Sequence, residues 1–160
     1  MHETSAGQAT DLIEADLGPG ARGYFTTRGL RALPVVPEKG TDAAARGSDE
    51  ETGVYSGWNL ALHVGDDPQR VRAHRHRLEE LLGLEPGRHL AWMDQVHSSV
   101  VAAARVEQTP TADALVLDAR SAGAPAGCCV LVADCVPLLL ASQDGSLTAA
   151  VHAGRRGMLD

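Results

Sequence analysis

The chain has 160 residues and a formal net charge of −7, from 14 Lys plus Arg against 21 Asp plus Glu, which argues against a dedicated nucleic-acid binder with a basic surface. Its length fits one domain, and hydrophobic residues at 44% are enough for a packed core and too many for a disordered chain. Aromatic residues amount to only 3%, so we expect a core of Leu, Val and Ala and no base-stacking surface for single-stranded nucleic acid.

Neither a membrane span nor a secretory signal is predicted. The longest apolar run, 128–141, is interrupted by Asp134 and Pro137 and is too short to cross a bilayer. Two of the three cysteines are adjacent, Cys128 and Cys129, which is not the pattern of a disulfide framework. We therefore expect a cytoplasmic protein with free thiols.

In chain order, residues 1–21 are polar, acidic and interrupted by Gly and Pro, and we expect a loose leader. The β-type residues of 23–27 predict a first strand. Residues 31–53 are rich in Pro, Gly and acidic side chains, which predicts a surface insertion. Such a long loop is unusual inside a compact domain, where loops beyond about 15 residues are uncommon.

A helix is predicted to begin at Asp66-Asp67-Pro68, because Asp is a good N-cap and Pro is favoured at the first helical position. Apolar residues then recur at helical spacing until Gly83, while charged residues occupy the other side. His74 and His76 lie two residues apart, so they face opposite sides of the helix and are poorly placed to share a metal.

Short apolar segments separated by Pro, Gly, Asp and Ser follow residue 87 and predict strands. The predicted strands are 90–93, 96–103, 114–117, 129–132, 137–141 and 147–152. Residues 142–145 form a plausible hairpin turn. Together with the helix, these elements indicate a mixed α/β or α+β domain that is rich in strands.

Residues 59–64 alternate in a period of two, which places Asn59, Ala61 and His63 on one face and three apolar side chains on the other. Two interpretations stay open. Asn59 and His63 could point into a cleft, or the segment could be an edge strand with a wet outer face.

His97, Cys135 and His152 each lie where an apolar segment meets a turn. Strand ends form the rim of a sheet, where functional sites are usually built. Two imidazoles and one thiolate could hold zinc with a fourth position open for water, which is the catalytic arrangement. The three residues are 38 and 17 positions apart, and no compact metal motif brackets them. A buried cysteine is also often simply a small apolar residue.

Other chemistry fits some of the same residues. Cys135 and His152 could be a nucleophile and its base, with Asp134 orienting the pair or serving only in a turn. Arg155 and Arg156 lie between two glycines and could bind an anion, although a solvated turn is the simpler interpretation. No Walker motif and no nucleobase-deaminase signature is present.

Several segments together resemble one family, the multicopper polyphenol oxidase or laccase-domain proteins. This family is also described as purine nucleoside phosphorylase/adenosine deaminase enzymes and as the peptidoglycan editing factor family. The segments are 25–28, 59–68, 92–97, 112–116, 132–137 and 150–154. Ser98 stands where the family pattern usually has Gly, and Arg155 stands where it usually has Trp.

The resemblance implies mixed β-sheets flanked by helices in a laccase-domain, CNF-like fold. Residues 22–160 would be a single catalytic-type domain covering the N-terminal two thirds of the family domain, with its C-terminal part missing. It also implies a zinc site at His97, Cys135 and His152. Copper fits less well, because three dispersed ligands do not supply the several centres of a multicopper oxidase.

The implied activity is phosphorolysis of adenosine, inosine, guanosine and methylthioadenosine, together with hydrolytic deamination of adenosine. Our mechanistic hypothesis has a zinc-activated water attack C6 of adenine and phosphate attack the ribose C1′. Cys135, Asp134 and His63 are the expected catalytic residues, and Asn59, Arg28 and Arg155 the expected substrate ligands.

Two alternatives stay open. One is a cysteine hydrolase of amide or peptidoglycan-related substrates that uses Cys135 as its nucleophile. The other is a truncated, non-catalytic metal-binding remnant, in which exposed sheet edges would favour a homodimer.

Overall fold

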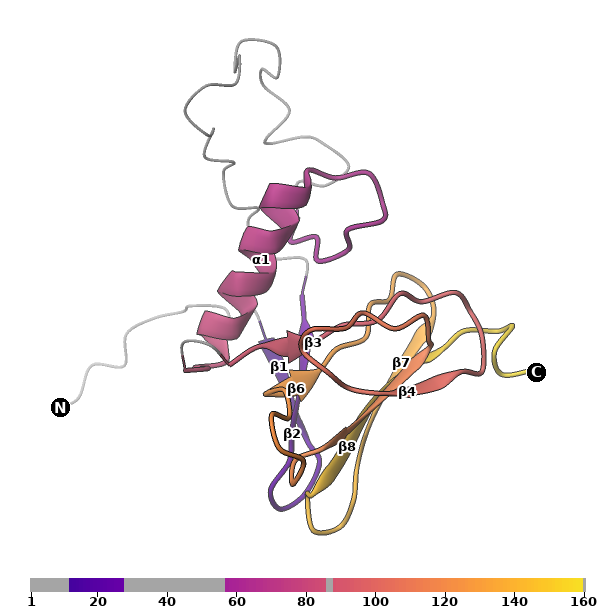
Figure 1. Ribbon diagram of the computed structural model, residues 1–160. Coiled ribbons are helices and arrows are strands. Elements are labelled where there is room, and N and C mark those ends of the chain that lie inside the picture. Colours follow the sequence, from indigo (N-terminus) through magenta and orange to yellow (C-terminus); the bar gives the residue numbers. More distant parts are fainter. Residues whose placement is uncertain (1–11, 28–56, 86–87, 160) are drawn as a thin grey trace, which may run out of the picture.

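The computed structural model describes residues 12–27, 57–85 and 88–159. Figure 1 shows one helix set against several small sheets. The elements are β1 (Leu12–Asp16), β2 (Arg22–Thr26), α1 (Pro68–Leu81), β3 (Leu90–Ala91), β4 (Val101–Ala103), β5 (Ala114–Asp118), β6 (Gly127–Cys128), β7 (Val136–Ala141) and β8 (Leu147–Ala153). The expected insertion 31–53 and Arg28 lie outside the described residues.

The largest sheet has four strands in the order β4-β5-β8-β7. β4 and β5 are parallel, whereas β8 is antiparallel to both β5 and β7. The predicted turn between β7 and β8 is confirmed. Its Gly145 has a φ of 69°, and the Asp144 carboxylate accepts hydrogen bonds from the Ser142 hydroxyl at 2.6 Å and the Ser146 amide at 3.1 Å.

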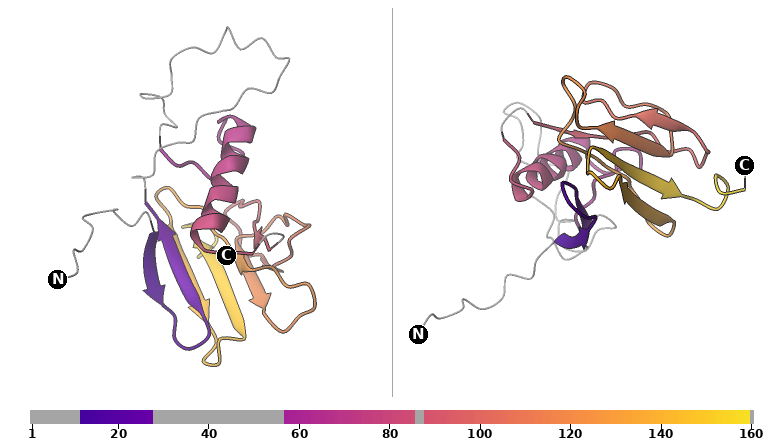
Figure 2. Two further views of the ribbon diagram at one scale, coloured as in Figure 1. Left: turned by 90° about the vertical axis from the view of Figure 1, so that its left-hand side faces the viewer. Right: turned by 90° about the horizontal axis from the view of Figure 1, so that it is seen from below.

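The first strand pair corrects the expected leader of residues 1–21, because Leu12–Asp16 is β1 and pairs antiparallel with β2. The strand predicted at 23–27 is confirmed as β2. This hairpin runs beside the β7–β8 hairpin (Figure 2). The approach is close, since a Cβ on Gly23 would lie 2.9 Å from Leu139 and a Cβ on Gly145 would lie 2.5 Å from the Pro19 carbonyl oxygen.

Helix α1 begins and ends as predicted. The Asp67 carboxylate caps it by accepting hydrogen bonds from the amides of Gln69 and Arg70, and Gly83 follows its end with a φ of 66°. His74 is fully buried, with its Nδ1 2.8 Å from the Asn59 carbonyl oxygen, whereas the side chain of His76 is 71% exposed. The two histidines thus face opposite sides, as expected. Helices were expected in the plural, and the described residues contain one.

Two apolar clusters form the core. One packs the helix residue Leu78 against Trp58, Leu60 and Leu90. The other gathers Ala91, Met93, Ala112 and Leu115, and so joins β5 to the strand pair β3–β6. The opposite face of the four-stranded sheet stays exposed, and its exposed apolar side chains are Val101, Val116, Val136, Leu138 and Leu140.

Four of the expected extended segments were wrong, two in part and two entirely. Of 90–93 only Leu90–Ala91 is a strand. Of 96–103 only Val101–Ala103 is a strand, because residues 96–98 turn their amides toward a side chain. Residues 129–132 lie beyond β6, and the amide group of Gln95 pairs there with the backbone of Leu131 at 2.7 and 2.8 Å. Residues 59–64 form no strand, and the expected core residues Leu62 and Val64 are each 40% exposed.

No helix in the described part of the chain is long and apolar enough to span a membrane.

Candidate metal centre

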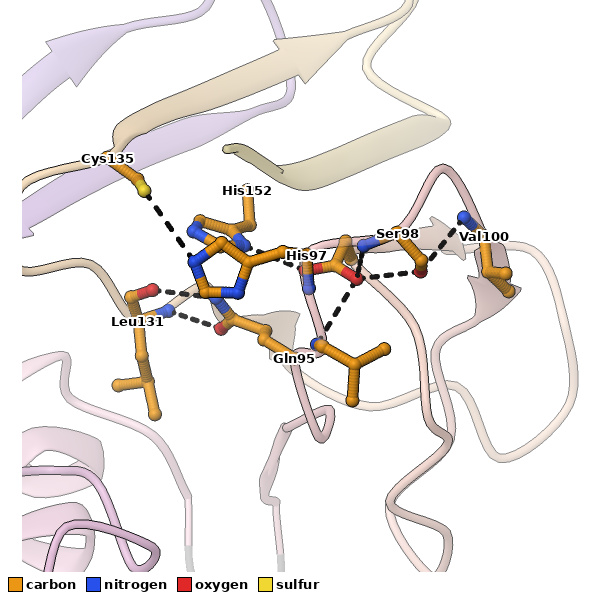
Figure 3. Close-up of polar contacts among 9 residues, drawn as sticks. Gln95, His97, Ser98, Val100, Leu131, Cys135 and His152 are labelled. Atoms are coloured by element: carbon orange, nitrogen blue, oxygen red, sulfur yellow. Dashed lines mark hydrogen bonds and ion pairs between the residues drawn. The ribbon is translucent and has the colours of Figure 1, made fainter. Parts of the chain in front are cut away.

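Two imidazoles and one thiol from separate segments meet at one end of the four-stranded sheet (Figure 3). The potential ligand atoms of His97, Cys135 and His152 all lie within 4.8 Å of one another. Cys135 Sγ is 3.9 Å from His97 Nε2, and the two imidazole rings meet edge to face with centroids 4.7 Å apart. The structure therefore brings together the three residues suspected from the sequence.

The β7–β8 hairpin places two of these side chains. Val136 pairs with Ala153 and Pro137 pairs with His152. Cys135, which directly precedes β7, consequently lies beside the end of β8 that carries His152. The turn at 142–145 sets this register, since the length and type of a hairpin loop decide which residues face each other.

His97 reaches the site from the loop between β3 and β4. Its φ of 61° is the only positive φ of a non-glycine residue within the described ranges. Such a left-handed conformation is unfavourable for a residue with a Cβ and persists where the surroundings enforce it. Here the amides of Val96, His97 and Ser98 all donate to the carboxylate of Asp113, at 3.3, 2.9 and 2.6 Å.

Asp113 also contacts His152. It is 2% exposed, and its Oδ1 lies 2.7 Å from His152 Nδ1. Burial by itself would raise the pKa of Asp113, but the hydrogen bonds from His152, Ser98 and His97 outweigh it and hold the pKa well below its usual range. Asp113 is therefore a carboxylate anion that only accepts hydrogen bonds.

Gly154 allows the two imidazoles to sit this close to the backbone. A Cβ at this position would lie 3.0 Å from His97 Cδ2 and 3.2 Å from His152 Cε1. Of these two rings, that of His152 is already held by Asp113. Any larger residue would therefore push on the two candidate histidine ligands.

The donor set fits a tetrahedral metal ion with one open position. Zinc bonds of about 2.0–2.3 Å would separate neighbouring ligand atoms by about 3.3–3.6 Å. The observed 3.9 Å between Sγ and Nε2 and the limit of 4.8 Å for all three atoms mean that the ligands would have to move closer together around a bound ion. His152 is buried, Cys135 is half-buried and His97 is exposed. This gradient leaves one side of the cluster accessible, as a catalytic site requires and a closed structural site does not.

The accessible side opens into a cleft of about 870 Å³. The three candidate ligands line it, and so do Asn59, His63 and Asp134. Residues of the β1–β2 hairpin and of the segment after Gly57 also line it. This volume matches the range of small-molecule sites, about 300–1,000 Å³.

The other expected site residues differ in their exposure, their hydrogen bonds and their contact with the cleft. His63 and Asp134 are exposed, whereas the Asn59 amide is held within its own segment, donating to Asp66 at 3.0 Å and to the Ala61 carbonyl oxygen at 3.1 Å. Arg155 is exposed and does not line the cleft. The carboxylate that contacts His152 is Asp113 and not Asp134, so the suggestion that Asp134 orients this histidine was wrong.

Sequence reasoning missed two residues of the site, Asp113 and Gln95. The available signal for Asp113 was a lone carboxylate between Ala112 and the apolar residues of β5. A charged side chain at the start of a buried strand needs hydrogen-bond or ionic partners, so this position is a candidate for a residue of the site. Gln95 and Asp113 both lie in segments that carried the family resemblance, 92–97 and 112–116, but nothing local indicated that the Gln95 side chain binds the backbone of Leu131.

Comparison with known proteins assigns the chain to a family. A family model described as multi-copper polyphenol oxidoreductase laccase matches residues 43–160, which is more than half of the chain. The chain belongs to this family. The resemblance seen in the sequence motifs is thus confirmed.

Two relatives of this laccase-domain chain are named purine nucleoside phosphorylase. The protein from Corynebacterium glutamicum is 44% identical over 108 residues, which are 64% of this chain and 42% of the relative. The protein from Pseudomonas aeruginosa is 38% identical over 104 residues, 65% of this chain and 40% of the relative. The chain thus spans well under half the length of these relatives.

A crystal structure of a Neisseria meningitidis protein supports the fold. It superposes with a TM-score of 0.66 at 32% identity, covering 92% of this chain and 52% of that protein. The laccase-domain fold expected from the sequence is confirmed at the level of a mixed α/β arrangement.

Proposed function

We propose that this chain carries the metal centre of a zinc-dependent purine nucleoside phosphorylase that also deaminates adenosine. The observation that supports this function best is the His97–Cys135–His152 cluster, which lines a cleft whose volume is within the range of small-molecule sites. The names of relatives at about 40% identity point to the same class of substrate. The proposed substrates are phosphate with adenosine, inosine, guanosine or methylthioadenosine.

The proposed metal is zinc, held by the two imidazoles and the thiolate. A zinc ion bound there would supply Lewis-acid chemistry at neutral pH. Copper stays the weaker choice, since the described residues offer one cluster of three ligands and a multicopper oxidase needs several centres.

The remaining roles belong to side chains around the cleft. His63 is exposed and lines the cleft, so its imidazole can give or take a proton. Asp134 lies beside Cys135 on the same wall and could accept a proton or a hydrogen bond. Asn59 at the cleft is also a proposed ligand for nucleoside or phosphate. The other two proposed ligands are Arg28, which lies outside the described residues, and Arg155, which is exposed and outside the lining of the cleft. In phosphorolysis a phosphate oxygen bonds to C1′ as the bond from C1′ to the base breaks, and the base leaves with a proton.

Zinc content and turnover of the purified chain test this proposal. We expect about one zinc per chain, lost in His97→Ala, and phosphate-dependent release of hypoxanthine from inosine. His76→Ala is the matched control, because His76 is an exposed histidine of α1 outside the cleft. Zinc without turnover would identify a metal-binding remnant, and no zinc would refute the metal centre.

A second candidate is a cysteine hydrolase acting on amide or peptidoglycan-related substrates. The sequence suggested His152 as the base, but the printed contact of the half-buried Cys135 thiol is with His97 Nε2 at 3.9 Å. His97 is therefore the proposed base, and the pair would have to close toward about 3 Å for proton transfer. Alkylation separates the two proposals. A thiol that reacts equally fast with and without zinc would favour the hydrolase, whereas protection by zinc would favour the metal centre.

A second copy of the chain is the proposed macromolecular partner. The exposed face of the four-stranded sheet carries Leu138 and Leu140 of β7, and β7 is an edge strand. Edge strands and apolar patches both favour association. Analytical sedimentation of the unchanged chain should show a dimer, and Leu138→Lys should convert this dimer to a monomer. If the unchanged chain is already a monomer, the proposed dimer is excluded.

A further inference from the structure

One buried carboxylate connects two of the three candidate ligands. Asp113 Oδ1 accepts from the His152 ring at 2.7 Å and from the His97 backbone amide at 2.9 Å. Both partners meet the same oxygen atom. Asp113 and His152 are 2% and 6% exposed, so little water competes for these bonds.

The backbone fixes this carboxylate opposite His152. Ala114 pairs with Val151 across β5 and β8, and the His152 amide donates to the Asp113 carbonyl oxygen at 2.8 Å. The main chain and the side chain of Asp113 thus both bind His152. The position of the carboxylate depends on the central strand pair of the sheet and not on a surface loop.

The contact determines which nitrogen of His152 is free. A carboxylate anion accepts hydrogen bonds and cannot donate them, so the proton of the His152 ring lies on Nδ1. A neutral imidazole with Nδ1 protonated has its lone pair on Nε2, which is the atom left to face His97 and Cys135. Carboxylates that hold metal-binding histidines in this way orient the ring and make it a better ligand.

The second oxygen of the carboxylate secures the loop of His97. Oδ2 accepts from the Ser98 amide at 2.6 Å, from the Ser98 hydroxyl at 2.7 Å and from the Val96 amide at 3.3 Å. Successive amides that converge on an anion form a nest, which stabilises left-handed backbone. His97 is the residue in that conformation.

We propose that Asp113 is a positioning residue for the metal centre, which fixes the Nδ1–H tautomer of His152 and the left-handed loop that presents His97. This inference rests on the proposed metal site and is independent of the nucleoside chemistry. Asp113 does not itself contact the metal or a substrate in this assignment. It acts through both histidines.

The test combines the tautomer of His152 with zinc affinity. The tautomer is read from long-range ¹H–¹⁵N NMR spectra of the metal-free chain at about pH 9, where an ordinary histidine is neutral. These spectra should show His152 protonated on Nδ1. Asp113→Asn should weaken this preference, since the five donors that now share two negatively charged oxygens would have to compete for one neutral amide oxygen. Chelator competition with zinc alone should show an affinity lower by about 10- to 100-fold.

Ser98→Ala is the matched control, because it removes one hydrogen bond to Oδ2 and leaves Oδ1 with both histidines. Because the Ser98 hydroxyl is one of three donors to Oδ2, the zinc affinity of this variant should fall by much less than that of Asp113→Asn. Protonation of His152 on Nε2 in the unchanged chain would overturn the proposal. So would a folded Asp113→Asn chain with unchanged zinc affinity, or an equal loss in Ser98→Ala.

Two further outcomes are also decisive. If Asp113→Asn does not fold, the tautomer in the unchanged chain alone supports or refutes the role of Asp113. If the unchanged chain binds no zinc, the metal centre itself fails, and the spectra separately report whether Asp113 still fixes the His152 ring.

Discussion

Gln95 binds the backbone of Leu131 as a neighbouring strand would. Its side-chain nitrogen donates to the Leu131 carbonyl oxygen at 2.7 Å, and its side-chain oxygen accepts from the Leu131 amide at 2.8 Å. The loop of His97 and the segment that leads to Cys135 are thereby joined. Two ligands of the candidate metal centre, 38 residues apart, depend on this pair of hydrogen bonds.

The first prediction concerns Gln95. Gln95→Ala should lower the free energy of unfolding by about 1–3 kcal/mol, because it leaves part-buried backbone groups of Leu131 without their partner. Urea unfolding followed by circular dichroism measures this difference. Gln143→Ala, in the exposed turn after β7, is the control and should change little. Equal stability of the two variants would contradict a structural role for Gln95.

Gly154→Ala should weaken zinc binding while the sheet stays folded. The added methyl would press on His97 and His152 at 3.0 and 3.2 Å, and the buried His152 ring, held by Asp113, has little room to yield. Chelator competition measures the affinity. Gly127→Ala is the matched control, since its methyl would meet only the end of the flexible Leu90 side chain at 3.1 Å. The prediction fails if both variants bind zinc equally well.

Asp67→Ala should destabilise the chain by about 1 kcal/mol, because Asp67 caps helix α1. Thermal or urea unfolding gives the value. Asp67→Ser should recover most of the loss, since serine is also a good N-cap. A serine variant as unstable as the alanine variant would show that the cap is not the cause.

Asp144 predicts a pH dependence of stability. Hydrogen bonds from Ser142 and then Ser146 lower its pKa to about 2, below its value in an unfolded chain, which is about 3.9. A lowered pKa stabilises the folded state above the unfolded value, and this contribution is lost as the pH falls toward 2. The stability difference between the unchanged chain and Asp144→Asn should therefore be constant above about pH 5 and shrink below about pH 4. A difference that does not vary with pH would refute the assignment.

Much of the local structure could be predicted from the sequence. Asp67, Pro68 and the helical spacing of apolar residues predicted α1, and the turn residues 142–145 between two apolar segments predicted the β7–β8 hairpin. These signals depend on neighbours within a few residues, where backbone preferences and capping act. The motifs around His97, Cys135 and His152 likewise indicated the family.

Local pattern failed where a distant side chain competes for the backbone. Apolar composition predicted strands at 96–103 and 129–132, but Asp113 binds the amides of the first segment and Gln95 binds the second. A hydrogen bond from a residue far along the chain leaves no trace in the composition of the segment that it binds. The same reason explains why 12–16, expected to be part of a loose leader, forms a strand once β2 lies beside it.

The sequence by itself determined which residue types were available for a metal: two histidines and a cysteine, each next to a turn. Only the tertiary structure decided that they meet and that Asp113 supports them. Pairing of β5 with β8 brings Asp113 to His152 across 39 residues, and the β7–β8 register brings Cys135 to the same end of the sheet. Such contacts arise from the burial of whole strands against one another, a property of the folded chain that no single segment contains.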